Sequence, residues 1–109
     1  MFLFTEHHIE LIKKGEKCQT RRLHHGRFRA KVGSIHQCRT TLFGPALCHI
    51  RILRTWHERL GDISANDAWE EGGYDQAEYQ IGLMEMHRGK VNLNTILECY
   101  EFELVKEAE

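Results

Sequence analysis

Residues 15–22 of the chain read Gly15-Glu16-Lys17-Cys18-Gln19-Thr20-Arg21-Arg22. This short stretch brings together a glycine, an ammonium, a hydroxyl and two guanidinium groups. Glycine lets the backbone come close to a ligand, lysine supplies a point charge, and arginine supplies a planar fork suited to phosphate. The stretch therefore indicates a turn that binds an anion. A helix end followed by basic surface residues would give the same letters, and the spacing is not that of a P-loop, in which lysine follows glycine directly.

The elements on either side of this turn can be predicted from capping residues and hydrophobic spacing. Thr5 is a suitable N-cap for a helix over residues 6–14, and Gly15 stands where a left-handed residue would end that helix. Residues 17–23 are predicted to be extended, and the polar, basic residues 24–31 are predicted to form a loop. The turn thus joins a helix to a strand.

The rest of the chain mixes strands and helices. The remaining elements follow in the order strand, strand, helix, helix, strand, at residues 34–41, 46–56, 64–73, 74–87 and 96–105. The first two form a hairpin about the Gly44-Pro45 turn. This order predicts an α+β fold.

Hydrophobic spacing also predicts which faces are buried. The helix at 74–87 places an apolar stripe toward the core, made of Tyr74, Ala77, Ile81 and Met84. The strand at 96–105 alternates with the period of a half-buried strand, and its inward side consists of Tyr100, Phe102 and Leu104.

Length and composition favour one globular domain over residues 1–109. The chain has 109 residues, of which 41% are hydrophobic and 28% charged, which is ordinary for a globular protein. No stretch has the apolar length of a membrane span or the pattern of a signal peptide. We therefore expect a cytoplasmic protein with no membrane partner, and we interpret Cys18, Cys38, Cys48 and Cys99 as reduced thiols.

The near-neutral net charge of −1 hides a strong asymmetry along the sequence. Residues 1–54 hold eleven Lys or Arg and three acids, a balance of +8, whereas residues 55–109 hold four and thirteen, a balance of −9. If the basic residues share one face, they would attract a phosphate backbone. The alternative is that the two halves neutralise each other across the fold.

Glu70 and Glu71 end the helix at 64–73, where the helix dipole disfavours carboxylates. A role beyond local stability is therefore expected for one of them. If Glu71 contacts Lys17, the pair is either a structural salt bridge or part of a reacting site in which Lys17 stabilises an oxyanion. Both interpretations remain open from the sequence.

Four blocks of sequence together resemble the ASCH domain, a small relative of the PUA-like RNA-binding β-barrels. The blocks are Gly15-x-Lys17-x-x-Thr20-x-Arg22, Val32-Gly33, Asp67-Ala68-x-x-Glu71-Gly72 and Tyr100-x-Phe102-Glu103-Leu104-Val105. The resemblance covers nearly the whole chain and keeps the order of the blocks. It implies a small β-barrel of about five to six strands, flanked by two to three helices, with a cleft that holds RNA or a nucleoside.

The resemblance also implies candidate chemistry. One branch of the family hydrolyses the acetyl amide of N4-acetylcytidine, and Lys17, Thr20 and Glu71 match its lysine, threonine and glutamate. Another member is described as a ribonuclease, and other members are domains of transcription coactivators, so the resemblance leaves enzymatic activity uncertain. The chain departs from the amidohydrolase branch at Cys18, at the doubled Arg21-Arg22 and in its basic loop.

We therefore predict a module that binds single-stranded RNA or a modified nucleoside in a basic cleft. The alternative is a hydrolase in the same cleft, either an amidohydrolase or a metal-independent ribonuclease, and a third possibility is a module that binds a protein partner. The predicted catalytic residues are Lys17, Thr20 and Glu71, and the predicted nucleic-acid contacts are Lys14, Arg21, Arg22, Arg27 and Arg29. No cofactor or metal is predicted, because the spacing of His36, Cys38, Cys48 and His49 does not suit a closed zinc site.

Overall fold

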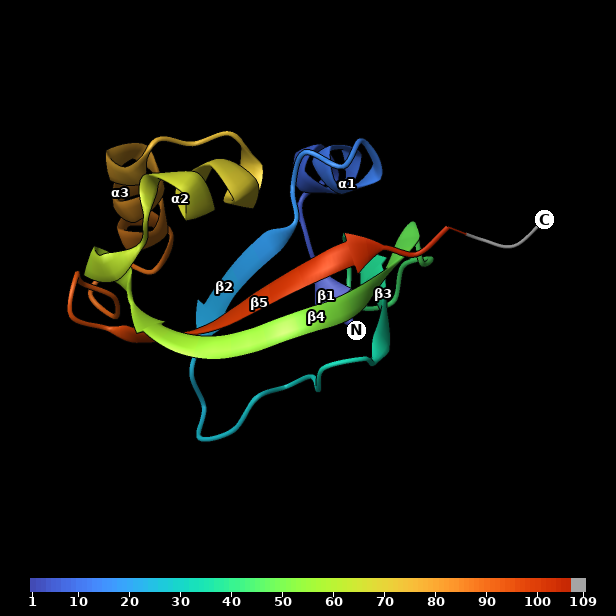
Figure 1. Ribbon diagram of the computed structural model, residues 1–109, viewed down its shortest axis with the longest axis horizontal. Helices are drawn as coiled ribbons and strands as arrows, with labels where there is room; N and C mark the ends of the chain where they lie inside the picture. The colour runs from blue at the N-terminus through green and yellow to red at the C-terminus, as the bar shows by residue number, and fades with distance from the viewer. Residues whose placement is uncertain (107–109) are drawn as a thin grey trace.

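The computed structural model describes residues 1–106 and has an α+β fold (Figure 1). It contains five strands, three α-helices and one 3₁₀ turn. Their bounds are β1 (Phe2–Leu3), α1 (Glu6–Lys13), β2 (Gln19–Leu23), β3 (Ile35–Arg39), β4 (Cys48–Arg59), η1 (Leu60–Asp62), α2 (Ala65–Gly72), α3 (Gln76–Met86) and β5 (Ile96–Leu104). Every predicted helix and strand is present, and the numbers of strands and helices agree with the predicted architecture.

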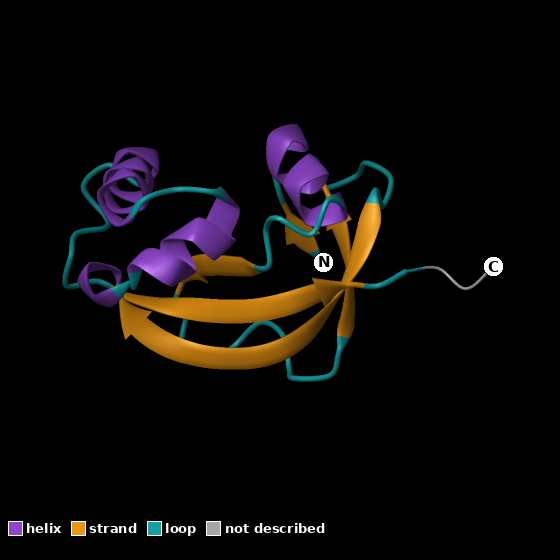
Figure 2. Cartoon of the chain, turned by 45° about the horizontal axis from the view of Figure 1, so that its top comes forward, coloured by secondary structure: helices purple, strands orange, loops and turns teal. Residues whose placement is uncertain are grey.

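The five strands form one sheet in the order β1-β3-β4-β5-β2. β1 pairs with β3 in parallel, and the other three pairings are antiparallel. The long strands β4 and β5 curve strongly, so the sheet is a curled half-barrel rather than a closed ring (Figure 2). The side chain of Arg22 on β2 reaches β1, where its Nη2 donates to the carbonyl oxygen of Leu3 over 2.9 Å.

Local sequence signals explain the helix ends. Thr5 caps α1 by accepting a hydrogen bond from the His8 amide, and Gly15 follows α1 with a φ of 79°. Ser64 caps α2 in the same way through the Asp67 amide. Asp75 and Glu78 form a capping box at the start of α3.

The buried face of α3 differs from the predicted stripe. Tyr79 and Leu83 are buried, whereas Ile81 is 52% exposed. Gln76 is exposed and Gln80 is half-buried, and their amides donate to the carbonyl oxygens of Ile63 and Leu60 at 2.7 and 3.4 Å. Hydrophobic spacing failed here because polar side chains beside the buried ones bind backbone carbonyls at and just after the neighbouring 3₁₀ turn.

Two hydrophobic cores lie on opposite faces of β5. Tyr100 and Phe102 belong to the core shared with β1 and α1, whereas Leu97 and Cys99 belong to the core beneath α2 and α3. The strand is therefore buried on both faces over residues 97–100, rather than half-buried as its alternation predicted. Within residues 1–106, no helix has the length and apolar character needed to cross a membrane.

Candidate functional site

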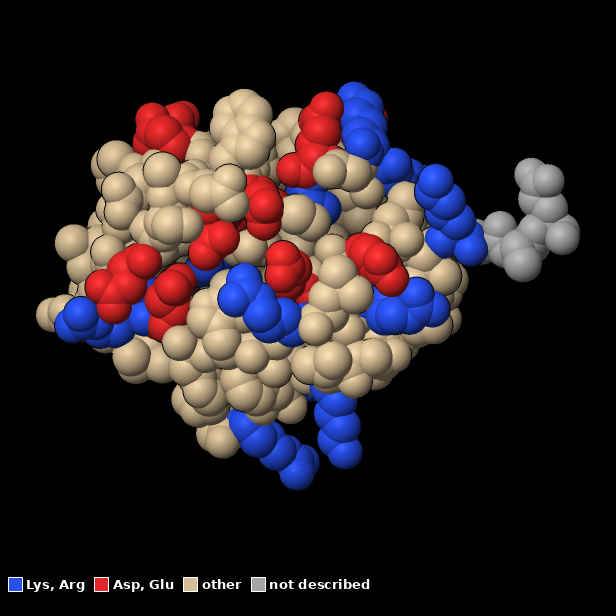
Figure 3. Space-filling model, in the orientation of Figure 1, with Lys and Arg blue, Asp and Glu red and all other residues tan. Residues whose placement is uncertain are grey.

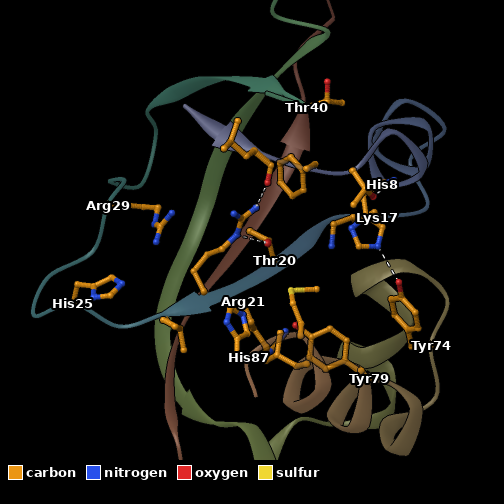
Figure 4. A pocket seen from close by; sticks show the side chains of 18 residues that line it. His8, Lys17, Thr20, Arg21, His25, Arg29, Thr40, Tyr74, Tyr79 and His87 are labelled. Carbon is orange, nitrogen blue, oxygen red and sulfur yellow. Dashed lines mark hydrogen bonds between the residues drawn. The ribbon is translucent and has the colours of Figure 1, made fainter. Parts of the chain in front are cut away.

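A hollow of about 600 Å³ opens beside β2, between α1 and α3 (Figure 4). Its polar and charged lining consists of Thr5, His8, Lys17, Thr20, Arg21, Arg22, His25, Arg29, Thr40, Tyr74, Tyr79 and His87. Its apolar lining consists of Leu3, Phe4, Leu23, Gly82, Leu83 and Met86. No carboxylate is among the described residues that line it. The wall is therefore rich in cations and imidazoles and also offers apolar and aromatic surface.

Lys17 lies at the floor of the hollow and contacts Glu71. Its Nζ donates to the carbonyl oxygen of Gln19 (2.8 Å), to the carbonyl oxygen of Glu71 (2.6 Å) and to Glu71 Oε1 (3.2 Å). Burial lowers the pKa of Lys17, and Glu71 opposes that shift. Because three acceptors match three ammonium hydrogens, the group is built to hold the charged form. A role beyond local stability was expected for Glu70 or Glu71, and the structure shows Glu71 in contact with Lys17.

Arg21 is also among the lining residues, but its side chain leaves β2 on the face opposite to Thr20 and is held by carboxylates. Its guanidinium contacts Glu71 Oε2 (2.9 Å), Glu58 Oε1 (2.9 Å) and Asp67 Oδ2 (3.4 Å). Although burial opposes the charge, Glu71 and Glu58 hold the pKa of Arg21 above its usual range. Its side chain is 1% exposed. Arg21 is therefore paired with acids of the same chain, and the phosphate contact predicted for it stays a prediction.

Arg22 points into the hollow beside Thr20. Its Nε donates to Thr20 Oγ1 over 3.0 Å, and its guanidinium lies 4.8 Å from the ring centre of Phe4. Burial lowers the pKa of Arg22, and the neighbouring charge of Arg29 lowers it further. Within the part of the chain that the structure describes, no carboxylate lies within 4 Å of it. Arg22 is thus a half-buried cation that has no carboxylate partner among the described residues.

His8 is a pocket residue that the sequence analysis did not single out. Its Nε2 lies 2.9 Å from the hydroxyl of Tyr74. Burial, and then the charge of Lys17, lowers the pKa of His8 to about 4, so the imidazole is neutral near pH 7. The signal was present, because His8 lies four residues before the buried Ile12 and therefore on the inward face of α1.

The structure brings the three predicted catalytic residues into one region but not into one contact. Lys17 and Thr20 both line the hollow, whereas Glu71 lies behind Lys17 and outside the lining. Thr20 Oγ1 pairs with Arg22. Of the remaining predicted nucleic-acid contacts, Arg29 lines the hollow, whereas Lys14 is exposed at the end of α1 and Arg27 is exposed in the loop after β2.

The basic and acidic halves of the sequence partly neutralise each other. Ion pairs join the first half to the second at Lys17–Glu71, Arg21–Glu58, Arg29–Glu98, Arg51–Glu103 and Arg54–Glu101. On the face shown in Figure 3, acids and bases alternate across the middle of the molecule. Basic side chains alone project at its lower edge, where the chain between β2 and β3 runs in Figure 1.

The cysteines and histidines of the β3–β4 hairpin do not gather as a metal site. Cys38 and Cys48 are free thiols at opposite positions of the β3–β4 ladder. Burial raises the pKa of the Cys38 thiol to about 12. Across residues 1–106, no group of three or more His, Cys, Asp and Glu side chains is placed to hold a metal ion.

Comparison with known proteins identifies the fold. No protein-family model and no curated protein matches the sequence. The structure is similar to an ASCH domain from Lactobacillus crispatus JV V101, with a TM-score of 0.72 and 21% identity over 89% of this chain and 69% of that one. The chain has the ASCH fold.

Two further solved structures share this ASCH fold with the chain. Protein EF3133 from Enterococcus faecalis V583, assigned to DUF984, has a TM-score of 0.66 and 17% identity over 95% of this chain and 74% of that one. The hypothetical protein PH0355 has a TM-score of 0.73 and 16% identity over 95% of this chain and 96% of that one. At these identities the likeness concerns the fold, so the function must be argued from the site.

Proposed function

We propose that the hollow beside β2 binds a nucleoside-containing ligand, in the form of single-stranded RNA or a modified nucleoside. The observation that carries the proposal is Arg22, a half-buried guanidinium with no carboxylate within 4 Å among residues 1–106, set in a hollow that no acid among those residues lines. Burying an unpaired charge is costly, and a bound anion would offset that cost. Phosphate suits the position because arginine binds it through a planar fork of donors.

The second arginine of the hollow supports the same ligand. Arg22 and Arg29 line one hollow, and the charge of Arg29 lowers the pKa of Arg22. An anion bound between them would relieve this repulsion. The rings of Phe4, Tyr74 and Tyr79 in the same wall supply the aromatic surface on which unpaired bases commonly pack.

Arg22→Gln tests the proposal, because the amide removes the charge and keeps hydrogen-bond donors. We expect affinity for single-stranded RNA to fall about tenfold or more, since a charge-assisted phosphate contact is lost. Affinity of the unaltered protein should also fall steeply with salt. Fluorescence anisotropy measures both effects, and urea unfolding checks that the variant is folded.

Arg39→Gln is the matched control, because Arg39 lies outside the hollow and its guanidinium is bonded to Gln37. This variant should bind RNA as the unaltered protein does. Binding that is insensitive to salt, or equal losses in the two variants, would contradict the proposal.

A hydrolase acting in the same hollow is the second candidate, and the placement of Thr20 beside Lys17 favours it. Thr20 Oγ1 accepts a hydrogen bond from Arg22, which leaves its own proton free to pass to the leaving nitrogen of an amide substrate as the C–N bond breaks. Water would then hydrolyse the acyl group from Thr20. Lys17 would stabilise a developing oxyanion through its charge alone, because its three hydrogens are already donated to Gln19 and Glu71. Its three hydrogen bonds and its contact with Glu71 make it a poor general base.

Thr20→Val separates binding from hydrolysis, because valine has nearly the same shape and no hydroxyl. The hydrolase hypothesis predicts that N4-acetylcytidine is converted to cytidine and acetate by the unaltered protein, that the variant forms no product, and that ligand affinity changes little. Mass spectrometry of products, with RNA as a second substrate and with EDTA present, measures this. Turnover that survives in the variant would exclude Thr20 as the nucleophile.

A further inference from the structure

A second hollow of about 430 Å³ lies beneath the chain between β2 and β3. It is lined by Arg27, Phe28, Arg29, Ala30, Lys31, Ser34 and His36. The lining within the described chain holds three cations and no acid. Burial lowers the pKa of His36, so the positive charge of this hollow comes from the two arginines and the lysine.

Arg29 joins the two hollows, because it lines both. Its Nε lies 3.7 Å from Glu98 Oε1, and its side chain is 38% exposed. The terminal nitrogens of its guanidinium have no hydrogen-bond partner among the residues described, so they remain available to a ligand. In Figure 4, the Arg29 side chain extends from the β2–β3 connection toward Thr20.

The loop that carries these cations is tied to the sheet rather than free in solvent. The amide of His25 donates to Glu98 Oε2 (3.3 Å), and the amide of Arg29 donates to the hydroxyl of Tyr100 (2.9 Å). The ring of Phe28 stacks on His57 with centroids 4.4 Å apart and meets Tyr100 edge-on. A loop fixed in this way presents its cations with less loss of conformational entropy on binding.

We propose that the second hollow is a phosphate subsite for a neighbouring nucleotide, so that the ligand of this chain is a single-stranded RNA rather than a free nucleoside. The inference rests on the proposed function of the first hollow. One nucleotide occupies the hollow beside β2, the RNA backbone passes over Arg29, and the next phosphates contact Arg27 and Lys31. A chain of regularly spaced phosphates matches two cationic hollows that share one arginine, whereas a free nucleoside leaves the second hollow unused.

The experiment compares a mixed-sequence RNA hexamer with a mixture of the four nucleoside monophosphates, using equilibrium dialysis at several salt concentrations. The unaltered protein should bind the hexamer at least about tenfold more tightly, because each additional exposed ion pair contributes a few-fold. The double variant Arg27→Ala/Lys31→Ala should lose this advantage. The slope of log K against log salt for the hexamer should become shallower by about 1.4, since each neutralised phosphate of a single strand contributes about 0.7.

A matched control removes two exposed cations elsewhere. Arg88 and Lys90 follow α3 and line neither hollow, so Arg88→Ala/Lys90→Ala should bind the hexamer with the affinity and the salt slope of the unaltered protein. The proposal is overturned if the Arg27/Lys31 variant behaves as this control does, or if the unaltered protein binds the hexamer no more tightly than the monophosphates.

Arg22→Gln separates failure of this inference from failure of the proposed function. If the second subsite alone is wrong, the monophosphates still bind the unaltered protein and lose affinity in the Arg22 variant. If the monophosphates bind equally well without Arg22, the assignment of the first hollow fails. Absence of any binding to the unaltered protein would overturn both.

Discussion

Glu71 on α2 and Glu98 on β5 are both almost completely buried, with 2% and 1% of their surfaces exposed, but their charges are balanced differently. Glu71 is paired with two buried cations, Lys17 and Arg21. Glu98 accepts hydrogen bonds from the Tyr100 hydroxyl (2.5 Å) and the His25 amide (3.3 Å), and its nearest full cation, Arg29, is 3.7 Å away.

The difference shows two ways of keeping a carboxylate inside a small protein. At Glu71 the partners are themselves buried charges, so removing one member leaves the others uncompensated. At Glu98 the partners are mostly neutral dipoles, which lose a hydrogen bond but not a charge balance when the carboxylate is removed. The first arrangement fixes the floor of the first hollow, and the second holds the loop that separates the two hollows.

Glu71→Gln should produce the largest effect. The neutral side chain leaves Lys17 and Arg21 buried with too little negative charge, which should lower the free energy of unfolding by about 3–5 kcal/mol. Urea denaturation measures the loss. The control is Glu70→Gln, because Glu70 is only half-buried and accepts from Gln19 over 2.8 Å. Similar losses of unfolding free energy in the two variants would show that the ion pairs of Glu71 do not stabilise the fold more than the contacts of Glu70.

Glu98→Gln should cost less, about 1–3 kcal/mol, because the amide keeps one acceptor oxygen and loses the other. The same urea titration applies, with Glu103→Gln as the control on the same strand. Glu103 forms an exposed pair with Arg51, so its loss should cost at most about 1 kcal/mol. A cost at Glu98 equal to that at Glu71 would remove the distinction between the two regions.

Tyr100→Phe should cost about 1 kcal/mol, since one hydrogen-bonding group is removed and the ring is kept. The hydroxyl donates to Glu98 and accepts from the Arg29 amide, so hydrogen exchange at that amide should become faster. Tyr74→Phe is the control, because it also removes a tyrosine hydroxyl, but one that pairs with His8 and not with Glu98 or the Arg29 amide. Exchange at Arg29 that speeds up in both variants would argue against a specific loop anchor at Tyr100.

The smallest expected effect is a pH dependence specific to Glu98. Burial disfavours its charged form, but hydrogen bonds from Tyr100, His25 and His24 outweigh this and hold the pKa of Glu98 below its usual value. Such a carboxyl stabilises the fold above its unfolded pKa of about 4.3, and that stabilisation is lost as the pH falls through the folded pKa. The stability difference between the unaltered protein and Glu98→Gln should therefore shrink on acidification below about pH 4.3. A difference that grows in acid would contradict the direction of this pKa shift.

The two regions also differ in how far the sequence predicted them. The contact between Lys17 and Glu71 was considered from the sequence, with two alternatives for its role, because acids at the end of a helix needed a partner and the resemblance linked both residues. The anchor at Glu98 was not predicted. The signal was present, because Glu98 stands two residues before Tyr100 and therefore on the inward side of the strand, whereas Glu101 and Glu103 stand on the opposite side. The position of an acid in a strand does not indicate which distant groups will donate hydrogen bonds to it.

Arg21 and Arg22, both predicted as nucleic-acid contacts, point to opposite faces of β2. Arg21 and Arg22 are neighbours in sequence, but successive side chains of a strand point to opposite faces. Arg21 meets the acids of α2 and β4, whereas Arg22 faces the hollow beside Thr20. The sequence could place both residues in a strand, but it could not show which face of that strand packs against carboxylates.

Sequence alone determined the order and type of every helix and strand except the two-residue β1, the helix cap at Thr5 and the mixed α+β class, because these depend on residues close together in the chain. Tertiary structure decided which cations are neutralised, where the two hollows lie, and which backbone carbonyls the amides of Gln76 and Gln80 bind. Those outcomes depend on groups brought together from distant segments, and the balance between a buried charge and its partner exists only once the fold has placed both.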